Sequence, residues 1–136
     1  MEKEQDKCVL VIEDSMPRGL AAILGITLGR QRPDLVGEDA ADSAGNRHPG
    51  IIRTPVPVLS GGAEVFQALR RRLAEPEFSD VAAVDFTYLA QSCRTYGAYI
   101  ERMAAAAPED LRYLGLALRG PRRQVDRLTG SLPLLR

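Results

Sequence analysis

Two acidic residues, Asp14 and Asp85, lie at or just after the ends of apolar runs that are typical of strands. At such positions an acidic side chain could take part in binding or catalysis. Asp14 comes soon after the run Lys7–Ile12, and Asp85 falls near the end of the run Val81–Phe86. Short apolar runs of this kind predict strands that are covered on both faces. In open α/β sheets the ligand crevice lies beyond the carboxyl ends of the strands. We therefore predict that Asp14 and Asp85 meet there as a carboxylate pair.

Further polar residues fall at predicted strand ends or helix starts. Thr87 follows Asp85, Arg119 and Gly120 end the last predicted strand, and Arg122 begins a basic helix. If that strand runs parallel to the others, Arg119 and Gly120 reach the same edge of the sheet. Arg18 precedes the first helix and is suited to a phosphate or a carboxylate. These residues together predict an anion site, to which helix N-termini contribute N–H groups.

Structural roles remain open for several of these residues. Asp14 is also suited to capping the first helix, Ser60 to capping the second, and Asp85 to capping the turn that follows it. His48 lies in a turn-rich loop without a Cys or Asp partner at ligand spacing, which favours a surface position. Cys8 and Cys93 are too few for a disulfide framework or a CxxC metal site, so both are expected to be reduced thiols.

The composition excludes several classes of protein. The 136 residues include 18 basic and 18 acidic side chains, so no net charge draws the chain to nucleic acid or to a membrane. Aromatic residues make up only 5% and tryptophan is absent, which argues against a stacking platform for single-stranded nucleic acid. Arginines nevertheless gather near the C-terminus, which predicts either an RNA-backbone contact or a solvated basic face: Arg119, Arg122, Arg123, Arg127 and Arg136.

The sequence also leads to expectations about where the protein is located and whether it carries a cofactor. The sequence shows no signal peptide and no apolar run long enough to cross a bilayer, so we expect a cytoplasmic protein. We expect no cofactor and no metal site.

The hydrophobic periodicity predicts one α/β domain over residues 1–136. Strands are expected at 7–12, 56–59, 81–86 and 114–118, and helices at 17–32, 62–75, 96–106 and 121–129. A hairpin is expected between residues 35–36 and 51–52, with its tip at 44–46. This order predicts a three-layer α/β/α sandwich around a small mixed, mostly parallel sheet.

The C-terminal pattern resembles that of a known family. Its matching residues are Leu114, Gly115, Gly120, Pro121, Val125, Asp126, Thr129, Gly130, Leu132 and Leu134. This pattern is similar to the end of the class II peptidyl-tRNA hydrolases. The resemblance implies their fold, a homodimer, and a functional acid at Asp85. Their Arg-Thr pair is matched by Arg94 and Thr95, after an inserted turn.

The same resemblance separates this chain from true peptidyl-tRNA hydrolases. Ile23 and Ile26 stand where those enzymes carry Gln and His, and only Arg18 stands where they carry lysines. The inserted segment 87–110 is expected to cover the crevice or to form a subunit contact. Nearly the whole chain resembles an uncharacterised microbial domain family of that fold.

Two functions follow from these observations. The first is binding without catalysis, at the carboxyl ends of the strands, of a small anionic or nucleotide-like ligand or of a protein partner. The second is hydrolysis of an acyl or peptidyl ester linked to tRNA or a nucleotide, with Asp85 and Arg18 as the catalytic residues.

Overall fold

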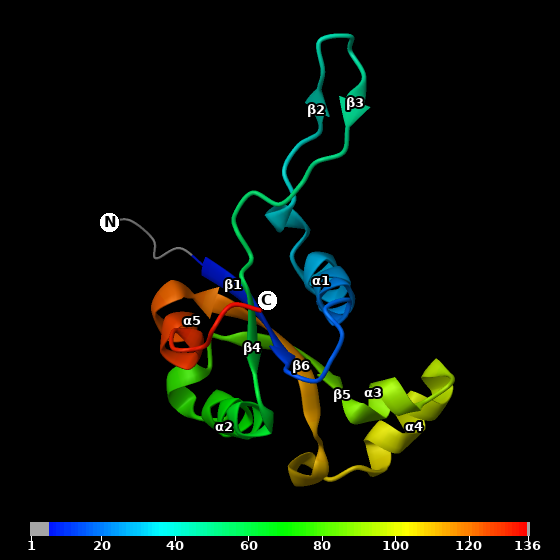
Figure 1. The fold of residues 1–136 in the computed structure, drawn as a ribbon, viewed down its shortest axis with the longest axis vertical. Coiled ribbons are helices and arrows are strands. Elements are labelled where there is room, and N and C mark those ends of the chain that lie inside the picture. The colour runs from blue at the N-terminus through cyan, green and yellow to red at the C-terminus, as the bar shows by residue number, and fades with distance from the viewer. Residues whose placement is uncertain (1–5, 136) are drawn as a thin grey trace.

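Four strands form one mixed sheet in the order β4-β1-β6-β5 (Figure 1). The computed structural model describes residues 6–135. The strands β1 (Asp6–Glu13), β4 (Val58–Gly61) and β5 (Ala82–Thr87) point the same way, and β6 (Tyr113–Pro121) runs antiparallel between β1 and β5. The predicted mixed sheet is confirmed, but only one of its three strand pairings is parallel, so a mostly parallel sheet and a parallel last strand are wrong.

Helices cover both faces of this sheet. On one face lies α1 (Leu20–Gln31), and on the other lie α2 (Ala63–Leu73) and α5 (Arg122–Thr129). Successive side chains of a strand point to opposite faces. In β1, Val9 and Val11 therefore pack toward α2 and α5, while Leu10 and Ile12 pack toward α1. Burial on both faces explains why residues 8–12 of β1 form an unbroken apolar run.

The chain between β5 and β6 forms a helical insertion beside the sheet (Figure 1). It contains α3 (Tyr88–Ser92), α4 (Tyr96–Ala105) and a short 3₁₀ turn at Pro108–Asp110. The sequence predicts α4 but not α3, which is too short to show a helical period. Similar 3₁₀ turns, each starting with proline, occur at Pro33–Leu35 and Pro76–Phe78.

The two edges of the sheet, β4 and β5, differ in whether another segment pairs with them. The C-terminal segment packs back on the body, as predicted, and Leu134 forms an isolated bridge with Leu59 of β4. At the opposite edge of the sheet, no strand of the described residues pairs with the outer side of β5.

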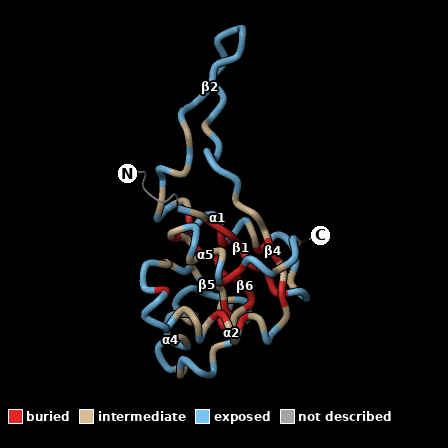
Figure 2. The backbone as a smooth tube through the Cα atoms, turned by 90° about the vertical axis from the view of Figure 1, so that its left-hand side faces the viewer, coloured by how far each residue is buried: buried red, intermediate tan, exposed pale blue. Residues whose placement is uncertain are grey.

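Residues 36–56 form a long arm that projects from the body (Figures 1 and 2). Its two short strands are β2 (Ala40–Ala41) and β3 (Arg47–His48), and Val36 bridges to Ile52 at its base. Gly45 at the tip has φ +85°, a conformation that glycine adopts without strain. The predicted hairpin is confirmed.

The predicted helix caps are wrong. The residue before α1 is Gly19 and the residue before α2 is Gly62, and neither helix has a capping hydrogen bond from a side chain. Asp14 and Ser60 therefore do not cap these helices.

Both cysteines are free thiols, as predicted, with Cys8 buried and Cys93 half-buried. Among residues 6–135, none of the helices has the length and apolar character that crossing a bilayer requires.

A glycine sets the distance between α1 and the sheet. A Cβ atom at Gly115 of β6 would lie 3.0 Å from Leu20 Cδ2 and 3.1 Å from Leu24 Cδ1. We expect Gly115→Val to lower the free energy of unfolding by about 1–3 kcal/mol, because the side chain overpacks this contact. Urea denaturation measures the change.

The matched control is Gly97→Ala in α4, where a Cβ atom would meet nothing within 4 Å. That variant should be unchanged or more stable by roughly 0.5–1 kcal/mol. Equal stability of Gly115→Val and the parent chain would show that α1 does not depend on this glycine.

Candidate functional site

The largest of the cavities described lies beside β5, between α1 and the helical insertion. Its volume is about 450 Å³, within the range typical of small-molecule sites. The lining combines an apolar floor with polar groups at the rim: Ile23, Leu24, Thr27, Val84, Asp85, Phe86, Ala90, Cys93, Arg94, Thr95, Tyr96 and Tyr99. The insertion thus covers a crevice, as one of its two predicted roles requires.

The helix α1 and the strand β5 contribute to this cavity through their ordinary periodicities. Ile23 and Thr27 lie one helical turn apart on α1, so they face the cavity together. Val84 and Phe86 alternate along β5 and pack on the α1 side of the sheet. Ile23 makes this wall of the cavity apolar.

Asp85 lies on the open outer strand of the sheet and contributes to the cavity rim. It is exposed, yet the protein around it displaces enough water to raise the pKa of its carboxyl above the usual value of 3.8. Within residues 6–135 its carboxylate has no hydrogen-bond or ion-pair partner. An acid with a raised pKa at a cavity is a candidate for function.

Two tyrosines lie within the electrostatic reach of Asp85. The pKa values of Tyr99 and Tyr113 are both raised. Burial is the larger cause for each tyrosine, and the negative charge of the Asp85 carboxylate is the next. Asp85 therefore lies between α4 and the start of β6. A carboxyl group with two neighbouring phenols can exchange a proton with a bound ligand.

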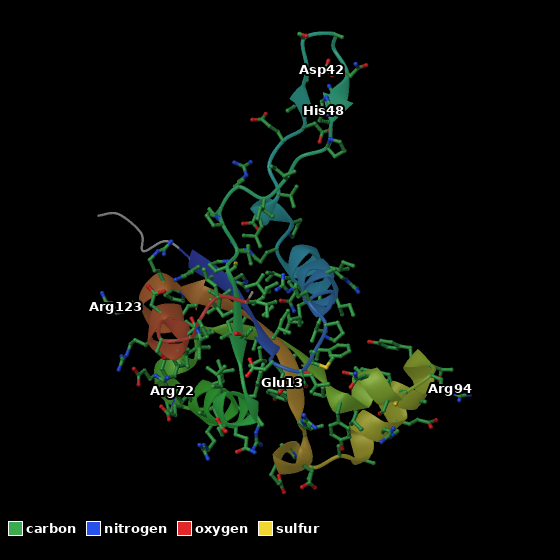
Figure 3. The ribbon with its side chains drawn as sticks, viewed as in Figure 1. Glu13, Asp42, His48, Arg72, Arg94 and Arg123 are labelled. Carbon is green, nitrogen blue, oxygen red and sulfur yellow. The ribbon has the colours of Figure 1, made fainter. Side chains whose placement is uncertain are left out.

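Arg94 and Thr95 join the cavity, where the resemblance placed a functional Arg-Thr pair. Thr95 caps α4, because its Oγ1 accepts a hydrogen bond of 3.1 Å from the backbone N–H of Ala98. Arg94 is exposed, and Figure 3 shows it at the outer end of the insertion. The guanidinium is thus available to an anion at the rim.

Cys93 lies in the same wall, which the sequence did not indicate. Arg102 donates hydrogen bonds to Ser92 Oγ at 3.1 Å and to Cys93 Sγ at 3.6 Å. These contacts tie α4 to α3, so they fix the shape of the rim.

The structure does not bring Asp14 and Asp85 together, contrary to the prediction. The strand β6 separates β1 from β5. The Asp14 carboxylate lies instead near Gly62, at the start of α2, where a Cβ atom would be 3.7 Å from Oδ2.

The predicted site residues Arg119, Gly120 and Arg122 are also separate from the cavity. Because β6 is antiparallel, Arg119 pairs with Cys8 and Ala82 near the amino ends of β1 and β5. Its guanidinium lies 3.7 Å from Asp6. Figure 3 shows Arg94 and Arg123 on opposite sides of the molecule, so the α5 arginines belong to another surface.

The remaining predicted residues do not line the cavity. Arg18 is exposed in the turn before α1, and the lining does not include it. Thr87 is fully buried at the end of β5, and its Oγ1 has no hydrogen-bond partner among the described residues.

A buried acid that the sequence analysis missed ends β1. Glu13 is only 7% exposed and accepts hydrogen bonds from the backbone N–H of Ser15, at 3.1 Å, and from the Ser15 hydroxyl (Figure 3). The position of Glu13 directly after the apolar residue Ile12 was the feature of the sequence that could have indicated its burial. Within residues 6–135 no cluster of three or more His, Cys, Asp or Glu side chains is arranged to hold a metal ion.

The fold and the cavity define an α/β domain with a ligand-sized crevice beside its outer strand. The model of the DUF2000 family, described as a protein of unknown function, matches residues 6–136. The chain therefore belongs to the DUF2000 family.

A solved structure shares this fold. It is a protein of unknown function from Agrobacterium tumefaciens strain C58, with a TM-score of 0.83 and 20% sequence identity. The match covers 96% of this chain and 98% of that one. No curated protein matches the chain. The resemblance to class II peptidyl-tRNA hydrolases stays a prediction.

The raised pKa of Asp85 predicts how stability depends on pH. The folded chain holds this proton more tightly than the unfolded chain, so stability falls as pH rises from the unfolded pKa through the folded one. We expect Asp85→Asn to be more stable than the parent chain at pH 7, because the variant has no charge to desolvate. Urea denaturation at pH 7 and at about pH 3 measures this, and at the lower pH the gain should disappear.

Asp80→Asn is the matched control. Asp80 is exposed and forms no side-chain hydrogen bond or ion pair within the described residues, so its stability should follow that of the parent chain at both values of pH. A loss of stability in Asp85→Asn at pH 7 would mean that the ionised carboxylate stabilises the fold.

Proposed function

We propose that this protein binds a small anionic or nucleotide-like ligand in the cavity beside β5, without peptidyl-tRNA hydrolase activity. The observation that carries the proposal is the convergence of Asp85, Arg94 and Tyr99 on one cavity of about 450 Å³ with an apolar floor. Ligand sites typically combine such a floor with a few polar groups that fix orientation.

Each part of the cavity suits a part of such a ligand. Arg94 offers a guanidinium to a phosphate or a carboxylate at the rim. Tyr96 and Tyr99 have ring centroids 5.5 Å apart, and Tyr96 is 75% exposed, so its ring is accessible to a planar group. Asp85, with its raised pKa, can donate or accept a hydrogen bond at a polar edge of the ligand.

Adenosine monophosphate is a suitable first probe, followed by amide chemical shifts. We expect shifts to concentrate in residues 23–27, 84–86 and 90–99. Arg94→Gln should weaken binding by about 10-fold or more, since hydrogen bonds to charged groups contribute roughly 1.5–3 kcal/mol. Adenosine, which lacks the phosphate, should bind the parent chain and Arg94→Gln equally weakly.

Arg112→Gln is the control, because Arg112 lines a different cavity of about 220 Å³. Its affinity for the probe should equal that of the parent chain. Equal binding of adenosine and adenosine monophosphate would contradict an anion site at Arg94.

Hydrolysis of an acyl or peptidyl ester linked to tRNA or a nucleotide is the second candidate. The raised pKa of Asp85 supports it, because a general acid or base works best when its pKa approaches the working pH. Against it stand the apolar Ile23 in the cavity wall and the absence of Arg18 from the lining. The arginines near the C-terminus also give it little support, since Arg119 of β6 pairs with Asp6 and Arg127 of α5 pairs with Glu77.

Incubation of the purified protein with peptidyl-tRNA separates the two candidates. We expect no cleavage above the spontaneous rate in parent chain and Asp85→Asn alike. Cleavage by the parent chain that disappears in Asp85→Asn, with the fold intact, would replace the binding proposal by the hydrolase.

A further inference from the structure

The projecting arm contacts little of its own molecule. Figure 2 shows residues 36–56 extending away from the body, and nearly all of these residues are exposed. Hydrogen bonds within the arm shape it, including one from the Gly37 N–H to the Ile51 carbonyl and one from the Gly50 N–H to Asp39. A two-stranded hairpin without further packing is only marginally stable in water. The arm therefore lacks the apolar packing that usually stabilises such a hairpin.

Apolar side chains are exposed at the base of the arm. Ile51 is 80% exposed, Ile52 50% and Val36 44%, so Ile51 is the most exposed of the large apolar residues described. Contiguous exposed apolar surface commonly marks an interaction site.

An apolar groove lies directly beside these residues. Its volume is about 220 Å³, and its walls come from α1 and from the arm base: Leu10, Gly25, Leu28, Gly29, Leu35, Val36, Ile52 and Val56. A Cβ atom on Gly25 or Gly29 would meet nothing within 4 Å, so the groove is open along α1. Ile26, next to Gly25, is 75% exposed and extends the apolar surface.

The arm and α1 carry opposite charges. The arm, residues 36–56, contains Glu38, Asp39 and Asp42 against Arg47 and Arg53, so acidic residues exceed basic ones by one. Residues 17–31 contain Arg18 and Arg30 and no acidic residue. Neither of these two arginines has an ion-pair partner within residues 6–135.

We propose that two copies of this chain associate through these surfaces, with Ile51 of each copy in the α1 groove of the other and each arm along the partner's α1. A two-fold interface requires a self-complementary surface, on which a projection and its receptor lie side by side. Ile51 adjoins Ile52, which lines the groove, so one chain carries both features next to each other. The acidic arm then faces the basic α1 of the other copy.

Light scattering at increasing protein concentration tests the association. We expect a dimer for the parent chain, and monomers for Ile51→Asp and for Gly29→Leu. The leucine side chain of Gly29→Leu would occupy the groove, and a Cβ atom at this position meets nothing within 4 Å, so we expect its circular dichroism to match that of the parent. Ile100→Asp is the control: Ile100 is 51% exposed on α4, away from both surfaces, and that variant should remain a dimer.

Cross-linking tests which surfaces meet. In a chain with Cys93→Ser, a mixture of Ile51→Cys and Gly29→Cys chains should form a disulfide-linked pair of one copy of each. A monomeric parent chain, or a dimer that survives both Ile51→Asp and Gly29→Leu, would overturn the proposal. A dimer whose mixture forms no such linked pair would overturn the arm exchange.

Discussion

The antiparallel pairing of β1 with β6 is the constraint on which the rest of the structure depends. It extends from Asp6 opposite Pro121 to Ile12 opposite Gly115, and both strands are buried on both faces. Because β6 runs against its neighbours, the residues that end it lie beside the residues that begin β1 and β5. Polar groups at the ends of the strands are therefore divided between two opposite ends of the sheet, and Arg119 cannot serve the same ligand as Asp85.

The cavity beside β5 follows from this arrangement. A parallel sheet usually holds its ligand where neighbouring strands end together. Here the insertion between β5 and β6 provides the missing wall, and Arg94, Thr95 and Tyr99 come from that insertion rather than from the strands. The chemistry of this fold can thus vary with the inserted helices while the β1–β6 core stays the same.

The sequence predicted the positions of the helices and strands better than the directions of the strands. The run Lys7–Ile12 and the repeated leucines of Leu114–Leu118 predict strands, but an alternating pattern is the same for both strand directions. The expected meeting of Arg119 with Asp85 failed for that reason, whereas Asp14 and Asp85 are apart because β6 lies between β1 and β5. Asp85 was predicted from its place at a strand end and from the family resemblance, and Arg94 and Thr95 were predicted from the resemblance alone. Cys93 and Glu13 were missed because burial next to Arg102 or Ser15 depends on tertiary packing, which a single sequence does not display.

The position of β5 at the end of the sheet has a consequence for solubility. The tail bridge at Leu134 covers part of the β4 edge, whereas the outer side of β5 has no strand partner within the described residues. An unpaired strand invites the strand of another molecule to add to it, and a charged side chain along the strand discourages this addition. Asp85 is the charged residue within Ala82–Thr87. We therefore expect the carboxylate whose pKa is raised by burial also to discourage the addition of a strand from another molecule at this edge.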